Sequence, residues 1–177
     1  MNPAVIDRFF ALLSLAGLGG AIALMIWWKI SPERVRATVG PLLFPLAAVV
    51  AVGAMGGSLL YSEAFERIPC SLCWFQRIFM YPIAFISVMS LIRKEKAILP
   101  YMGTLAIFGA VISTAHVLEQ NTSWFSSPVC VADVPCSIKY VNEFGFVSTP
   151  VMALCCFILI AVASFVASAV AKQTENA

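Results

Sequence analysis

Five long apolar stretches separated by short polar segments dominate the chain. They cover residues 9–30, 41–62, 74–92, 98–118 and 148–171. A helix needs about 20 residues, at roughly 1.5 Å per residue, to cross the hydrocarbon core of a bilayer, so each stretch is long enough to span it. The sequence lacks the ten-residue alternating segments typical of a membrane β-barrel. The pattern therefore predicts an all-α integral membrane protein with five transmembrane spans.

The first apolar stretch has to be distinguished from a secretory signal. It is longer than the apolar part of a signal peptide, and a basic segment with Lys29, Arg34 and Arg36 takes the place of a small-residue cleavage site. We therefore expect residues 9–30 to be retained as a transmembrane helix.

Composition supports a membrane protein and argues against one class of partner. Hydrophobic residues make up 61% of the 177 positions and charged residues 11%, whereas soluble domains are roughly 45–50% apolar. The formal net charge of +2 is small and its charges are scattered. We therefore expect membrane lipid, and no nucleic acid, around this chain.

The distribution of lysine and arginine predicts the orientation of the spans, because basic residues near helix ends stay in the cytoplasm. With the N-terminus outside, seven basic residues lie inside, namely Lys29, Arg34, Arg36, Arg93, Lys94, Lys96 and Lys172. Four lie outside, namely Arg8, Arg67, Arg77 and Lys139. This orientation places the C-terminus inside and the segments 63–73 and 119–147 outside.

Four of the six cysteines, Cys70, Cys73, Cys130 and Cys136, fall in or at the edge of these two outward segments. Disulfides persist in an oxidising compartment, so the cysteines support the orientation that the charges predict. The opposite orientation would put them in a reducing cytosol, where metal binding is the commoner use. Cys155 and Cys156 lie inside the last apolar stretch, and we assign them no role.

A Cys-x-x-Cys motif such as Cys70 and Cys73 has several chemical uses. Haem attachment requires a histidine after the second cysteine, but Trp74 stands there. A zinc site is disfavoured because five residues separate Cys130 from Cys136, more than zinc-ligand pairs usually have. Inert disulfides that cross-link the loops remain an alternative to a redox-active site.

The position of the motif favours redox chemistry. Cys70 and Cys73 fall at the start of the third apolar stretch, where unpaired N–H groups and the helix dipole stabilise a thiolate. Arg77 lies one turn after Cys73 on the same face and adds a fixed positive charge. His116 lies near the outward end of the fourth stretch, at the same depth. For Arg77 the alternative to a role in the site is a side chain that simply extends to the membrane interface. For His116 the alternative is an ordinary interfacial histidine.

The segments PCSLCWFQRIFMYP, HVLEQ, VCVADVPCSIKYVNEFGF and STPVMAL resemble, in this order, the DsbB family of disulfide bond formation proteins, and above all its shorter BdbC-type members. The resemblance covers residues 42–171. It implies a four-helix bundle in the bacterial cytoplasmic (inner) membrane. It also implies a thiol:quinone oxidoreductase that reoxidises a DsbA-like thioredoxin-fold thiol oxidase and passes the electrons to ubiquinone or menaquinone.

By motif position, Cys70 and Cys73 resemble the membrane-proximal pair of that family, with Cys73 next to the quinone, and Cys130 and Cys136 resemble the loop pair that meets the partner. Arg77 and His116 resemble residues on the quinone side. The resemblance divides the chain into an extra N-terminal helix with its connector (1–40), a redox domain (41–171) and a tail (172–177).

The helix expected at 9–30 departs from the family's four-helix pattern. A second class of function also remains open, a non-enzymatic membrane anchor or assembly subunit whose loops carry two structural disulfides.

Overall fold

The computed structural model describes residues 3–122, 129–130 and 134–175, and nearly all of its regular structure is helical. The elements are α1 (Pro3–Ile30), α2 (Pro32–Thr38), α3 (Gly40–Leu59), the π-helical turn η1 (Leu60–Ala64), α4 (Ser71–Arg93), α5 (Leu99–Asn121) and α6 (Thr149–Glu175). Five helices, with α3 and η1 forming one of them, are long and apolar enough to cross a membrane. The predicted all-α fold with five spans is confirmed.

The helices differ from the apolar stretches mainly at their ends. α1 begins at Pro3, six residues before the predicted start, and α4 begins at Ser71 because Cys70 has an extended backbone and occupies the N-cap position. The sequence did not predict α2, which starts at Pro32 and carries a Glu33–Arg36 ion pair of 2.8 Å. Polar residues extend each helix past its apolar part, so hydropathy marks the membrane core rather than the helix ends.

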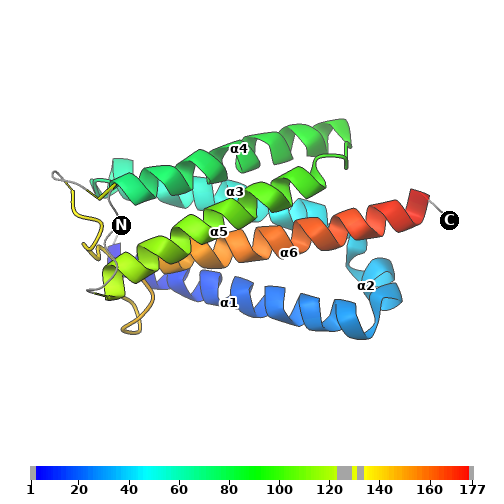
Figure 1. Ribbon diagram of the computed structural model, residues 1–177, viewed down its shortest axis with the longest axis horizontal. Coiled ribbons are helices and arrows are strands. Elements are labelled where there is room, and N and C mark those ends of the chain that lie inside the picture. Colours follow the sequence, from blue (N-terminus) through cyan, green and yellow to red (C-terminus); the bar gives the residue numbers. More distant parts are fainter. Residues whose placement is uncertain (1–2, 123–128, 131–133, 176–177) are drawn as a thin grey trace.

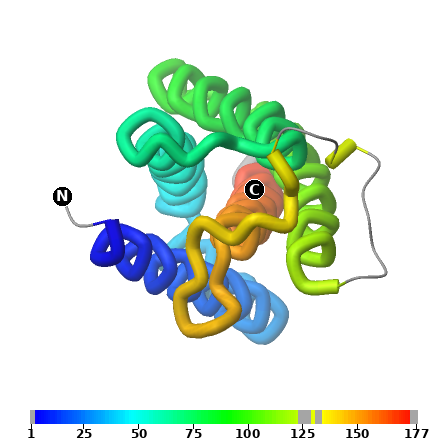
Figure 2. The backbone as a smooth tube through the Cα atoms, turned by 90° about the vertical axis from the view of Figure 1, so that its left-hand side faces the viewer, coloured from blue at the N-terminus to red at the C-terminus, as the bar shows by residue number. Residues whose placement is uncertain are grey.

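The helices run roughly parallel to one long axis. Figure 1 shows the N-terminus, the start of α4 and the end of α5 at one end of the bundle, and the C-terminus at the other. In the end-on view of Figure 2, α6 occupies the centre, with α1, α3 and α5 around it, and α4 lies at the top beside α3 and α5. Phe157, Ile160 and Ala163 on α6 are fully buried. Both predicted cysteine segments therefore lie at the end of the bundle that holds the N-terminus.

Two glycines allow α5 to approach α6 closely. A Cβ atom at Gly103 would lie 2.9 Å from the ring of Phe165, and one at Gly109 would collide with the ring of Phe157. Small residues are the usual means by which membrane helices come this close. Gly109 lies seven residues before His116, on the same face of α5. The close contact therefore turns His116 into the bundle.

The extra helix α1 packs along α6 and is attached to the cysteine end by an ion pair. Arg67 donates two hydrogen bonds to the carboxylate of Asp7, at 2.9 and 2.8 Å, and its guanidinium lies 4.8 Å from the ring centre of Tyr61. Both side chains of the pair are largely buried. Breaking a buried ion pair leaves one charge unpaired at a cost of several kcal/mol, so this contact fixes α1 firmly.

Candidate functional site

The pair Cys70 and Cys73 forms the start of α4. Pro69 precedes Cys70, whose extended backbone directs the chain into the helix, and the two Sγ atoms lie 3.0 Å apart as free thiols. Cys70 is buried, and Cys73 is partly buried. The two sulfurs are placed to close into a disulfide when they are oxidised.

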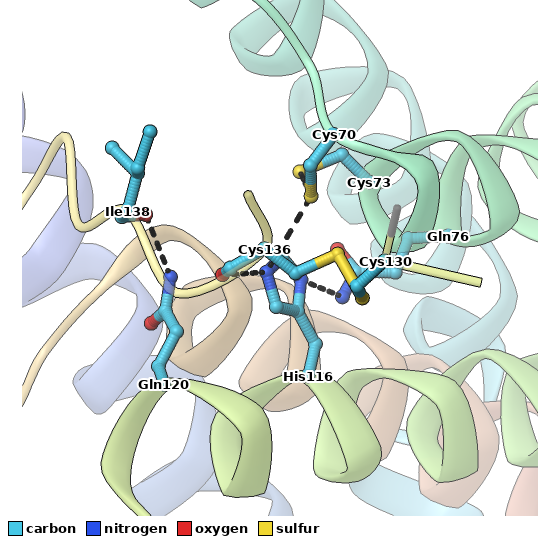
Figure 3. The surroundings of a disulfide bond; sticks show 8 residues. All are labelled: Cys70, Cys73, Gln76, His116, Gln120, Cys130, Cys136 and Ile138. Atoms are coloured by element: carbon cyan, nitrogen blue, oxygen red, sulfur yellow. Dashed lines mark hydrogen bonds between the residues drawn. A yellow bond between two sulfur atoms is a disulfide. The ribbon is translucent and has the colours of Figure 1, made fainter. Parts of the chain in front are cut away.

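The pair Cys130 and Cys136 is a disulfide, with its Cα atoms 5.6 Å apart. Cys136 is buried, and it packs in one cluster with Cys70 and Leu72. Figure 3 shows the loop disulfide beside the thiols at the start of α4. The loop pair and the helix pair, which are 60 residues apart in sequence, therefore meet in one place.

His116 on α5 lies between the two cysteine pairs. Its Nε2 is 3.1 Å from the carbonyl oxygen of Cys136 and 3.6 Å from Sγ of Cys70, and its Nδ1 is 3.2 Å from the amide nitrogen of Gln76 (Figure 3). Because the amide of Gln76 donates to Nδ1, the ring proton lies on Nε2. His116 therefore donates toward the Cys136 carbonyl and the Cys70 sulfur from one N–H group.

These contacts favour a thiolate at Cys70. Hydrogen bonding from Cys73 lowers the pKa of Cys70 most, burial opposes the change, and His116 lowers it further, to about 4. The sequence predicted a stabilised thiolate at Cys73, beside Arg77, and this stays a prediction. Of the two sulfurs, Cys70, at the N-cap, is the one that also lies within reach of His116.

Reduced protein should keep a thiolate down to acid pH. Since the pKa of Cys70 is lowered, its thiolate absorbance near 240 nm should persist as the pH falls from 8 to 5 and disappear near pH 4. His116→Phe removes one of the donors, so the same transition should move to higher pH. Cys70→Ser should abolish the signal. Loss of absorbance near pH 8 in the unsubstituted protein would contradict this assignment.

Arg77 is buried one turn beyond Cys73 on α4. Its Nε donates to Oγ of Ser58 at 2.9 Å and its Nη2 to the carbonyl of Ser58 at 3.0 Å, and both bonds tie α4 to α3. The guanidinium lies 5.0 Å from the ring centre of Trp74. Among the described residues it forms no ion pair, so its positive charge remains available to a bound ligand.

A cavity of about 490 Å³ extends from the cysteines between α1, α3 and α6. Its polar end is lined by Cys70, Cys73, Gln76, Arg77 and His116, and the rest of its wall is mainly apolar. The hydroxyl of Tyr81, also in the lining, is buried without a hydrogen-bond partner in the described part of the chain. Cofactor pockets of roughly 300–1,000 Å³ with few polar groups are common. These residues fit a quinone, which has a flat head with oxygen acceptors and an apolar tail.

The two thiols at the start of α4 and the imidazole of His116 also form the one group of potential metal ligands among the described residues. Cys70, Cys73 and His116 place one ligand atom each within 4.8 Å of one another. Structural zinc sites use four ligands, and this group offers three. A reactive dithiol with a histidine donor has the same composition, so the group alone does not indicate a metal.

All six predicted site residues lie close to one another or in the cavity wall. Cys70, Cys73, Arg77 and His116 line the cavity, while Cys130 and Cys136 pack against its cysteine end. Their chemical roles stay predictions. Sequence reasoning missed Gln76, Ser58 and Tyr81, and it assigned no role to Cys155 and Cys156, which line the α6 side of the cavity. Gln76 and Tyr81 follow the cysteines on the same helix, and this spacing was the signal that could have identified them as site residues.

Comparison with known proteins gives one family. The profile of the family described as "Disulfide bond formation protein DsbB" matches residues 41–167. The chain is 48% identical over 113 residues to "Disulfide bond formation protein C" of Bacillus subtilis (strain 168), covering 63% of this chain and 82% of that protein. It is 43% identical over 121 residues to "Probable disulfide formation protein" of Oceanobacillus iheyensis, covering 67% and 83%. No solved structure matches the chain significantly. The family profile begins after α1 and α2.

Proposed function

Because the chain belongs to the DsbB family of disulfide bond formation proteins, we propose that it is a thiol:quinone oxidoreductase of the bacterial cytoplasmic membrane. It reoxidises a DsbA-like thioredoxin-fold thiol oxidase and passes two electrons, through its two cysteine pairs, to ubiquinone or menaquinone. The observation that carries the proposal is the meeting of both cysteine pairs at His116, at the polar end of a mainly apolar cavity.

The loop disulfide is the site that the partner attacks. A partner thiolate attacks Cys130, the more exposed of the two sulfurs, the Cys130–Cys136 bond breaks, and Cys136 leaves as a thiolate. The second partner thiol then attacks the mixed disulfide and releases Cys130. The partner is now a disulfide, and the loop pair holds the two electrons.

The loop dithiol next reduces the disulfide of Cys70 and Cys73. A loop thiolate attacks one sulfur of that pair, the second loop thiol resolves the mixed disulfide, and the loop disulfide forms again. Cys70 is a good leaving group because its pKa is lowered. The arrangement described here, with an oxidised loop pair and free thiols at Cys70 and Cys73, corresponds to the state after this step.

The residues of the cavity prepare the last transfer. A bound quinone supplies the acceptor for two electrons and two protons. Cys73 lines the cavity and is the sulfur nearest in sequence to Arg77, whose positive charge favours negative charge that develops there. His116 holds a proton at Nε2 beside Cys70, and the apolar wall excludes water from the sulfurs.

The charge distribution supports an orientation with both cysteine pairs on the extracytoplasmic side. The seven-to-four distribution of basic residues favours an orientation with the end that holds Cys70 outside and the C-terminus inside. An outward position gives the loop pair access to a soluble partner. The division into residues 1–40, 41–171 and 172–177 follows the same proposal.

The test is quinone reduction by the purified chain supplied with a reduced DsbA-like partner. We expect one partner disulfide to form for each quinone that is reduced. The loss of quinone absorbance measures the reduction of quinone, and alkylation of the remaining thiols measures the oxidation of the partner. A reaction without the protein measures direct reduction of the quinone by thiols. No turnover with either quinone, together with a loop disulfide that the partner does not open, would support the non-enzymatic anchor instead.

A further inference from the structure

The cavity continues along α1, away from the cysteines. Its wall includes Phe10, Leu13, Ser14, Ala16 and Gly17 of α1. This helix precedes residues 41–167, the part of the chain that the family profile covers. An element outside the family profile therefore forms one wall of the proposed quinone cavity.

The apolar part of the cavity lies between α1 and α3, with α6 behind it. Phe10 approaches α3 beside Gly57, where a Cβ atom would be 3.5 Å from its ring, and it contacts Tyr61 at 5.9 Å between ring centres. Further along, the wall consists of Ala16 and Gly17 on α1 and residues such as Val49 on α3. This apolar part belongs to the same cavity as the polar end at Cys73 and Arg77.

The ion pair fixes this wall relative to the redox pair. Arg67 lies three residues before Cys70 and binds both carboxylate oxygens of Asp7 at the start of α1. The first turns of α1 are thereby attached to the segment that carries the cysteines. The width of the channel next to the cysteines depends on this attachment.

We propose that α1 forms one wall of a channel for the isoprenoid tail of the quinone, so that this chain selects quinones by their tails as well as by their head groups. The proposal rests on the proposed function and adds a second subsite to it. Lipid chains are as apolar as this wall, so the selection arises from shape rather than from burial of apolar surface. A side chain that fills the channel should therefore exclude a tailed quinone and still admit a bare head group.

Ala16→Phe tests the channel, because Ala16 is exposed and lines the cavity, which leaves room for the ring. Ala23→Phe is the matched control, since Ala23 is also exposed, lies seven residues further along the same helix face and is not part of the lining. Dissociation constants are measured by quenching of tryptophan fluorescence. The probes are the tail-less head groups of ubiquinone and menaquinone, and the same head groups with a decyl chain.

For each variant we compare the dissociation constant of the head group with a decyl chain to that of the tail-less head group. We expect Ala16→Phe to raise this ratio at least about tenfold, and Ala23→Phe to leave it as it is in the unsubstituted chain. Because each ratio is taken in the same detergent, partition of the tail into micelles cancels between variants. An unchanged ratio in Ala16→Phe, or equal changes in both variants, would overturn the tail channel.

A second measurement uses the unsubstituted chain and so does not depend on how a variant folds. A quinone with a diazirine at the end of its decyl tail is photolysed, and the labelled peptide is identified by mass spectrometry. Label in residues 10–17 is expected, and label confined to α4 and α5 would overturn the proposal. If the unsubstituted chain reduces quinone but the label lies elsewhere, the proposed function stands without the channel. If it reduces no quinone, the proposed function itself fails.

Discussion

Cys73→Ser is expected to lower quinone reduction by on the order of a thousandfold or more, because removal of a group that reacts covalently usually costs at least that much. The disulfide of Cys70 and Cys73 cannot form in this variant, so no electrons can pass from the loop pair to the cavity. The rate of quinone reduction is measured with the reduced partner and, separately, with dithiothreitol.

The same variant should also accumulate a trapped species. The remaining Cys70 thiolate can attack the Cys130–Cys136 disulfide, and no neighbouring Cys73 thiol is then present to resolve the product. A disulfide between Cys70 and one loop cysteine should appear in peptide mass spectra. Cys130→Ser provides the contrast, since it should lose oxidation of the partner but keep quinone reduction driven by dithiothreitol. Quinone turnover in Cys73→Ser would contradict the route.

Arg77→Ala is expected to lower the turnover number for quinone by about a hundredfold, in line with the loss of one preorganised charge from an active site. The reason is that Arg77 supplies a buried positive charge at the polar end of the cavity, and it forms no ion pair among the described residues. The measurement is kcat and KM for quinone at a saturating concentration of reduced partner.

Two further variants separate charge from geometry. Arg77→Lys keeps the charge but loses the planar guanidinium that binds both Oγ and the carbonyl of Ser58, so it should fall between Arg77→Ala and the unsubstituted chain. Ser58→Ala removes one anchor of Arg77 and should cost about tenfold. Rates that stay within twofold in Arg77→Ala would show that the arginine only joins α4 to α3.

The sequence was sufficient for the helices because membrane spans leave a strong local signal. Twenty apolar residues predict a span whatever surrounds them, and all five predicted spans are present. The predicted positions of the helix ends were less accurate, because polar residues such as Asp7 near the start of α1 belong to the helix but not to the apolar stretch. The short α2 was missed since seven residues carry little periodicity.

The contacts within the site depend on tertiary structure, so the sequence carries a weaker signal for them than for the helices. The cysteines, Arg77 and His116 were found through their chemistry and spacing, whereas Gln76 and Ser58 are ordinary polar residues until the fold places them beside His116 and Arg77. The pairing of Cys130 with Cys136 was open as well. Arg67 was counted only as an outward charge, because its partner lies 60 residues earlier in the chain.

The single N–H group that His116 presents to two acceptors links loop position to redox state. When Cys70 is in a disulfide it is a poor acceptor, so the proton bonds fully to the carbonyl of Cys136 and retains the loop. When Cys70 becomes a thiolate, it competes for the same proton and weakens that bond. In the arrangement described here, with free thiols at Cys70 and Cys73, the contact of Nε2 with the Cys136 carbonyl is still the shorter of the two. One imidazole therefore acts as the clasp that keeps the loop disulfide beside the thiols at the start of α4.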